Sequence, residues 1–171
     1  MSWAQANRRK TAWEWDAILL SDECYIHLNG TAGHVWVTRT VNEVYNEACL
    51  VPAFKQLPVR VMVWSCIAHD WKGPLVILNY PGGKGGGMSA ERYQKQVLRT
   101  HVVKAMKDLC HHCARKIKIQ YQQDSAFCHT AESTIKWLEN YKIPLVPHRA
   151  CSPNVSPIEP VWHELKKHIC A

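Results

Sequence analysis

Short apolar stretches of strand length fill the first half of the chain. Residues 17–28, 34–40, 59–68 and 74–79 are short apolar stretches that contain β-branched or aromatic residues, and each is interpreted as a strand. A glycine-bearing turn separates the first two stretches, and the five residues HDWKG separate the last two. Strands joined by such turns form hairpins. We therefore expect three or four meandering strands in this half.

The apolar spacing changes to a helical period after a glycine-rich connection at residues 80–87. A helix is predicted from Ser89 to about Cys113. Its apolar stripe consists of Tyr93, Val97, Val102, Val103, Met106, Leu109 and Cys110. Ile117, Ile119 and Tyr121 then alternate with polar residues, which predicts a strand that ends just before Asp124.

Two more helices and one short strand complete the predicted elements. A helix is expected from about Thr130 to Tyr141, with Thr130 as its N-cap, and a short strand is expected at 143–147. A closing helix follows, and its predicted buried face consists of Ile158, Trp162, Leu165 and Ile169. Antiparallel hairpins followed by strand–helix–strand crossovers predict a mixed sheet with helices on its faces.

This order of elements is that of the α/β ribonuclease H-like fold, with a mixed five-stranded sheet flanked by helices. In that fold the first strand and the strand that ends at Asp124 lie side by side, about 4.8 Å apart. Asp22 and Asp124 should then face the same spot.

Composition narrows the class of protein. The chain has 171 residues, of which 47% are hydrophobic and 20% charged, so it is long enough for one well-buried domain and is not disordered. Lys and Arg outnumber Asp and Glu by 21 to 14, which gives a net charge of +7. Such an excess suits a polyanionic partner, most simply nucleic acid.

Several features bear on the compartment and the domain boundaries. The chain opens without the apolar core of a signal peptide, its eight cysteines include some in strand-like runs, and no apolar run approaches the roughly 18 residues that span a bilayer. We expect a soluble intracellular protein with reduced thiols and no membrane contact. Residues 1–16 resemble an interdomain linker, so we expect one domain over residues 17–171.

Three carboxylates are candidates for a metal site. Two neighbouring carboxylates such as Asp22 and Asp124 repel each other, and a cation relieves the repulsion. Oxygen ligands suit Mg²⁺ or Mn²⁺, and Glu159, at the start of the closing helix, would complete a site for two ions. For Glu159 a structural alternative stays open, because Ser156 and Glu159 also have the spacing of a capping box.

Four segments carry a resemblance to a known family. LLSDE (19–23), VMVW (61–64), QQDSAFCHT (122–130) and SPNVSPIEPVW (152–162) are similar, in order, to the motifs of the mariner-like (Tc/mariner) superfamily of DDE transposases. The 34 residues between Asp124 and Glu159 match the spacing of one major branch. The resemblance implies that Asp22, Asp124 and Glu159 are the catalytic triad. It also implies two divalent ions, cleavage and joining of DNA strands at transposon ends and target, a homodimer and a nuclear location.

The chain also departs from the family motifs. Ser125 and Phe127 stand where the family usually has Asn and Pro, and Asn154 and Ser156 replace Asp and Asn. Pro160 follows the candidate glutamate. The paired helix-turn-helix region that precedes the catalytic domain in the family is also absent from this sequence. These departures keep open a truncated or decayed copy, or a catalytically inactive domain that binds DNA or a protein partner. A ribonuclease H-type nuclease acting on hybrids is a third alternative.

A further set of residues could support the site or contact DNA. His129 and Asn154 are candidates for supporting the carboxylates, although His129 could equally be a residue at the entry of a helix. Basic side chains near the end of the chain could contact DNA phosphates, or could simply form a solvated helix face. These are Arg149, Lys166 and Lys167.

Overall fold

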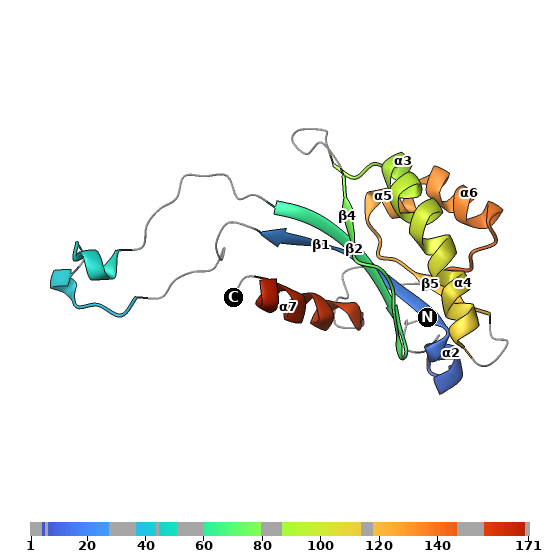
Figure 1. Cartoon of the computed structure of the whole chain (residues 1–171), viewed down its shortest axis with the longest axis horizontal. Helices are drawn as coiled ribbons and strands as arrows, with labels where there is room; N and C mark the ends of the chain where they lie inside the picture. Colours follow the sequence, from blue (N-terminus) through green and yellow to red (C-terminus); the bar gives the residue numbers. More distant parts are fainter. Residues whose placement is uncertain are drawn as a thin grey trace.

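Five strands form one mixed sheet at the centre of the computed structural model (Figure 1). They are β1 (Ile18–His27), β2 (Arg60–Ala68), β3 (Trp71–Lys72), β4 (Val76–Leu78) and β5 (Gln120–Gln122). The strand order is β3-β2-β1-β5, and β4 pairs with β2 as well. The structure describes residues 5, 7–27, 37–43, 45–50, 60–79, 87–113, 118–146 and 156–169.

The two neighbours of β1 run in opposite directions. β2 is antiparallel to β1, with a register from Leu20 opposite Ile67 to His27 opposite Arg60. β5 is parallel to β1, and its last pair is Leu20 with Gln122. The expected contact between the first strand and the strand before Asp124 is therefore confirmed, as is a mixed five-stranded sheet.

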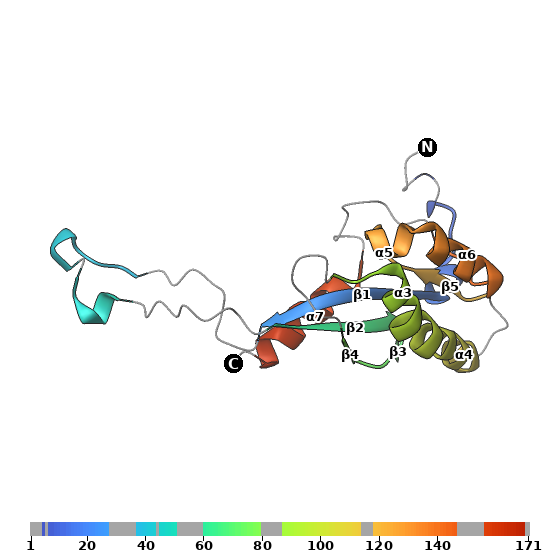
Figure 2. The same ribbon diagram turned by 90° about the horizontal axis from the view of Figure 1, so that it is seen from above.

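The expected hairpin between 17–28 and 34–40 is wrong in its second strand. Residues 37–40 form no strand, and 34–36 lie outside the described residues. β2 pairs with β1 along Leu20–His27 on one edge, and β5 pairs with Ile18–Leu20 on the other edge. The short helices η1 (Val41–Glu43) and η2 (Glu47–Cys49) lie far from the sheet in both views (Figures 1 and 2).

Helices cover both faces of the sheet (Figure 2). One face carries α3 (Ala90–Tyr93), η3 (Gln94–Val102), α4 (Val103–His112), α5 (Phe127–Thr130) and α6 (Glu132–Asn140), and the other carries α7 (Ile158–Ile169). The predicted helix from Ser89 to Cys113 is confirmed, since α3, η3 and α4 follow one another without a break and η3 is π-helical. Ser89 is the N-cap, and its Oγ accepts a hydrogen bond from the Arg92 amide at 3.2 Å.

Alternation along β1 divides the buried residues into two clusters. The large cluster lies between the sheet and α3–α6, and its members include Leu19, Trp64, Tyr93, Leu98 and Tyr121. The small cluster lies under α7 and consists of Cys24, Ile26, Val63, Ile158 and Trp162. Neighbouring residues of a strand point to opposite faces. Odd-numbered residues of β1 such as Leu19 therefore face α3–α6, and even-numbered ones face α7.

Three local predictions in the second half need correction. Thr130 is not an N-cap, because it ends α5 and its Oγ1 donates to the Ala126 carbonyl, while Ala131 precedes α6. The short strand at 143–147 is reduced, within the described residues, to one bridge between Leu145 and Tyr121. Ile169 is exposed, whereas the other predicted apolar residues of α7 do pack against the sheet.

The N-terminal segment and the thiols complete the description. Residues 12–16 form helix α2 (Ala12–Asp16), which has a capping box between Thr11 and Glu14, and a domain boundary at residue 17 stays a prediction. The six cysteines of the described residues are free thiols. Within the same part of the chain, every helix is too short or too polar to cross a membrane.

Candidate functional site

Asp22 lies in the middle of β1 on the face covered by α7. Its Oδ2 accepts a hydrogen bond from Nε1 of Trp162 at 2.9 Å. Trp162 is buried in the small cluster and comes from α7, so this bond ties the closing helix to the first strand across 140 positions of sequence. The indole donor fixes the orientation of a carboxylate that is only partly exposed to solvent.

The environment of Asp22 disfavours a negative charge. Burial is the largest influence and raises the pKa of Asp22, the Trp162 donor lowers it, and the nearby charges of Glu23 and Glu159 raise it again. Together they move the pKa of Asp22 from its ordinary value of 3.8 to about 6. Burial and two nearby acids make the ionised form of this carboxylate less stable, and a cation beside it would stabilise that form.

Glu159 is the second residue of α7 and is exposed. Its amide donates to the Ser156 carbonyl at 3.2 Å, which forms the backbone turn at the start of the helix. Pro160 is the third residue of α7, where a backbone N–H has no intrahelical partner in any case, so this departure from the family motif leaves the helix intact.

Asp124 follows β5 in a short segment without regular secondary structure that leads into α5. Its Oδ1 accepts two hydrogen bonds, from the Ala126 amide at 2.9 Å and from Nδ1 of His129 at 2.5 Å. The bond to Ala126 closes an Asx turn, a common way for Asp to terminate a strand. The Asp124 side chain is 50% exposed, so solvent reaches it.

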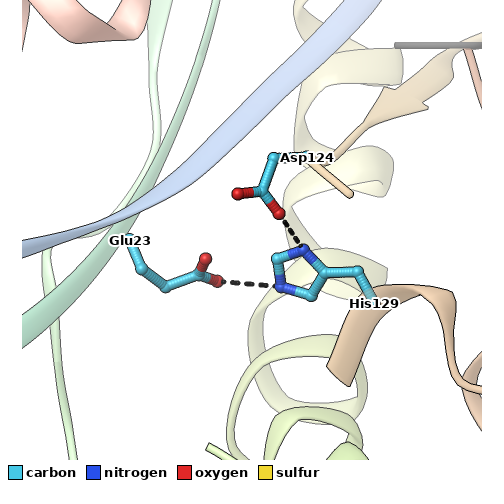
Figure 3. Close-up of side chains that lie close together, drawn as sticks. All are labelled: Glu23, Asp124 and His129. Carbon is cyan, nitrogen blue, oxygen red and sulfur yellow. Dashed lines mark hydrogen bonds and ion pairs between the residues drawn. The ribbon is translucent and has the colours of Figure 1, made fainter. Parts of the chain in front are cut away.

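His129 lies between two carboxylates (Figure 3). Its Nδ1 bonds Asp124, and its Nε2 lies 3.5 Å from Oε1 of Glu23, an ion-pair distance that exceeds a good hydrogen bond. Burial lowers the pKa of His129, but the hydrogen bonds with Asp124, Cys128 and Glu23 outweigh burial and raise it to about 12. The imidazole is therefore positively charged at neutral pH and balances the two acids.

A chain of buried hydrogen bonds lies behind His129. Ser21 Oγ and Tyr121 Oη are 2.7 Å apart, and Tyr121 Oη and Tyr93 Oη are 2.9 Å apart. Tyr93 then donates to Oε1 of Gln123 at 2.8 Å, and Nε2 of Gln123 donates to the backbone carbonyl of His129 at 3.3 Å. Four segments, β1, α3, β5 and α5, are joined by this chain.

The structure divides the predicted site residues into two groups. Asp22 and Glu159 are near enough to repel each other on the α7 side. Asp124 and His129 form a compact group with Glu23, with one ligand atom from each within 4.8 Å of the others. A single site shared by Asp22, Asp124 and Glu159 stays a prediction.

The remaining predicted residues have no contact that tests their roles. Asn154 and Arg149 lie outside the described residues. Lys166 and Lys167 are exposed in the last turn of α7, and Nζ of Lys167 lies 2.8 Å from Oε1 of Glu164. Their contact with DNA stays a prediction.

Sequence reasoning missed the partners of the two aspartates. Glu23 and Tyr93 were not singled out as site residues, and Trp162 was assigned only to the core. One signal was available for Glu23: residues 21, 23 and 25 of a strand share a face, so a carboxylate next to Asp22 must point to the opposite side of the sheet.

The chemistry of the donors fits a hard divalent cation. Asp22, Asp124 and Glu159 offer oxygen ligands, which Mg²⁺ and Mn²⁺ prefer. Burial is the main cause of the raised pKa of Asp22, and the charges of Glu23 and Glu159 add to it, so a cation beside Asp22 would stabilise its ionised form.

Comparison with known proteins adds relatives and fold neighbours. No family model matches the chain. The chain is 27% identical over 169 residues to the transposable element Tc1 transposase of Caenorhabditis elegans and 26% identical to the Tcb1 transposase of Caenorhabditis briggsae. Each match covers 99% of this chain and 58% of the relative. The chain therefore spans little more than half the length of these relatives.

Solved structures share the fold. The catalytic domain of Mos1 mariner transposase matches 96% of this chain, with a TM-score of 0.60, 17% identity and coverage of 65% of that domain chain. The mariner Mos1 paired-end complex with Mg matches 98% of this chain, with a TM-score of 0.65, 20% identity and coverage of 45% of that chain. The predicted ribonuclease H-like fold is thus confirmed.

Proposed function

Since the chain belongs to the Tc1/mariner superfamily of transposases and corresponds to its catalytic domain, we propose that it cleaves and joins DNA strands with two divalent metal ions. The proposed catalytic and metal-binding residues are Asp22, Asp124 and Glu159. The proposed ions are Mg²⁺ or Mn²⁺, and the proposed substrates are transposon ends and target DNA.

The observation that carries this proposal is the parallel pairing of β1 with β5. The last pair, Leu20 with Gln122, lies two residues before Asp22 on one strand and two before Asp124 on the other. Parallel strands carry equivalent positions to the same end of the sheet, which supports a shared site for the two aspartates. The nearness of Glu159 to Asp22 supports the third member.

Each proposed ligand is positioned by a neighbouring donor or by the helix that carries it. Asp22 is oriented by the indole of Trp162, and Asp124 by the Ala126 amide and the His129 imidazole. Glu159 is carried by a helix that packs on β1. When bound, two ions supply activation of a water or a 3′-hydroxyl and stabilisation of the leaving oxygen.

A nicking assay tests the proposal. The full chain with Mn²⁺ and supercoiled DNA should yield nicked circles, and Asp124→Asn should abolish them. Asp108→Asn is the matched control, because it is the same substitution at an exposed aspartate of α4, and it should keep the activity. A folded chain that never cleaves DNA with either metal would refute the enzymatic part.

A non-catalytic DNA- or protein-binding domain is the second candidate. Phe127 favours it, because this residue takes the place of the family proline at the first position of α5, close to Asp124, and is 85% exposed. This candidate predicts that calorimetry finds no Mn²⁺ binding, or binding that Asp22→Ala leaves unchanged.

The proposed partners follow from the proposed reaction. A substrate of duplex DNA agrees with the net charge of +7 and implies a nuclear location in a eukaryotic cell. Two transposon ends would be handled by a homodimer. The similar Mos1 transposase structures include a paired-end complex and a strand transfer complex, which supports this assignment.

A further inference from the structure

The side chain of Asp124 is bonded to His129, a buried residue that also contacts Glu23 and Tyr93. Oδ1 of Asp124 receives the His129 donor at 2.5 Å, and the other nitrogen of that ring faces Glu23 at 3.5 Å (Figure 3). Asp124 is 50% exposed and lies between β5 and α5, outside both. Without such a donor a half-exposed aspartate has several rotamers within reach.

The imidazole has little freedom to move. His129 is 2% exposed, and its ring stacks at a tilt on Tyr93, with the ring centroids 4.2 Å apart. Its backbone carbonyl is bonded to Gln123, which is fixed in turn by Tyr93. The buried network to Tyr121 therefore sets both the backbone and the ring plane of His129.

The alternation of side chains along β1 places Glu23 on the opposite face of the sheet from Asp22. Its neighbour Asp22 points toward α7, whereas Glu23 points toward α3 and α5 and meets His129. The Glu23 side chain is only 15% exposed. Adjacent residues of β1 thus have different roles: Asp22 is a proposed metal ligand, whereas Glu23 contacts His129, which bonds the proposed ligand Asp124.

We propose that His129 and Glu23 are positioning residues for Asp124: the imidazole, with Glu23 at ion-pair distance from its other nitrogen, fixes the Asp124 carboxylate in the orientation that binds the metal. This inference rests on the proposed function, because it takes Asp124 to be a metal ligand. Both described bonds to Asp124 use Oδ1, and together they hold the carboxylate in one orientation. Partners of this kind orient ligands in many metal sites.

A matched pair of variants tests the role of the Nδ1 donor. In His129→Asn the amide nitrogen is attached at Cγ, as Nδ1 is, so it can still donate to Asp124. In His129→Gln the amide lies one atom farther out, near the place of Nε2, and misses Asp124. Both variants remove the charge of the ring, so their difference reports the placement of the donor and not the loss of a cation.

The readout is the Mn²⁺ affinity of the full chain, measured by calorimetry and by the EPR signal of free Mn²⁺. We expect His129→Gln to bind Mn²⁺ about tenfold more weakly than His129→Asn, at the lower end of the effect of outer partners on metal sites. Circular dichroism establishes that both variants are folded. A ratio above threefold supports the inference, and a smaller ratio overturns it.

Asp124→Asn separates this inference from the proposed function. If that change leaves Mn²⁺ affinity intact, Asp124 is not a ligand and the proposed function fails. If it removes binding while the His129 pair is equal, only the positioning role fails.

If either His129 variant does not fold, the inference can be tested on the unmodified chain by NMR. With ¹⁵N-labelled histidine, Mg²⁺ at a concentration that calorimetry shows to saturate the chain should shift both ring nitrogens of buried His129. Exposed His112 on α4, which lies on the opposite face of the sheet from α7, serves as the internal reference and should not shift. An unshifted His129 overturns the inference.

Discussion

Replacing Asp22 by Asn should make the metal-free protein more stable. The carboxylate is partly buried, accepts one hydrogen bond from Trp162, and is destabilised by burial and by the charges of Glu23 and Glu159. Asn has nearly the same shape, and its Oδ1 can accept the Trp162 hydrogen bond. The change therefore removes an unfavourable charge and keeps the packing.

The size of the effect follows from the pKa of Asp22. A rise from 3.8 to about 6 means that ionised Asp22 lowers the free energy of unfolding by about 3 kcal/mol at pH 7.5. Because the folded state holds its proton to higher pH than the unfolded state, wild-type stability falls as pH rises from about 4 to 6. The advantage of Asp22→Asn should be absent near pH 3, about half developed at pH 5, and complete above pH 7.

Urea unfolding in EDTA, followed by circular dichroism at pH 5.0 and 7.5, measures this difference. At pH 7.5 the variant should melt roughly 5–10 °C above the wild type in a parallel thermal scan. Mn²⁺ should narrow the gap, because an ion that binds only the folded wild type stabilises it in proportion to the logarithm of its concentration.

Asp108→Asn is the control for a generic effect of removing an acid. Its side chain is exposed on α4, so its stability should change by no more than about 0.5 kcal/mol at either pH. An Asp22→Asn protein that is equal to or less stable than wild type at pH 7.5 would refute the account of Asp22 as a buried, uncompensated charge.

Three further predictions concern groups around the site. Trp162→Phe keeps an aromatic ring in the small cluster but removes the donor to Asp22, so calorimetry should show weaker Mn²⁺ binding and urea titration a loss of about 1 kcal/mol. Tyr93→Phe breaks the buried hydrogen-bond chain and leaves acceptors unpaired, so unfolding should require about 1–3 kcal/mol less. Lys166→Ala should reduce the slope of log affinity for DNA against log salt by about one in fluorescence anisotropy, whereas Lys136→Ala on the opposite face of the sheet should not.

Elements with a clear hydrophobic period were predictable from the sequence. β1, β2 and β4 have compact apolar runs, and the stripe from Tyr93 to Leu109 extends over several turns, so local spacing was enough to identify them. The position of β1 beside β5 followed from the order of the elements, and the parallel register confirms it.

Pairing between distant strands was not predictable in the same way. The sequence after β1 contains an apolar stretch and a glycine turn, which favour a local hairpin. β2 instead supplies eight residues in register with β1, an extensive ladder that a short local strand would have to displace. Pairing between distant strands depends on how the side chains on both faces of the sheet pack against other elements. The local sequence pattern around β1 does not contain this information.

The candidate site shows the same division at the level of single side chains. The acidic residues could be named from motif and spacing, but the orientation of each depends on a donor from another element: Trp162 for Asp22 and His129 for Asp124. In β1 the period of two sends Asp22 and Glu23 to opposite faces, so a shift of this strand by one residue would exchange the proposed ligand with the anchor of His129. The buried bond between Ser21 and Tyr121 opposes that shift, because it fixes an odd-numbered residue on the side of α3 and α5. The register of β1 is therefore the physical quantity on which the proposed chemistry depends, and the polar network is one of the interactions that hold it.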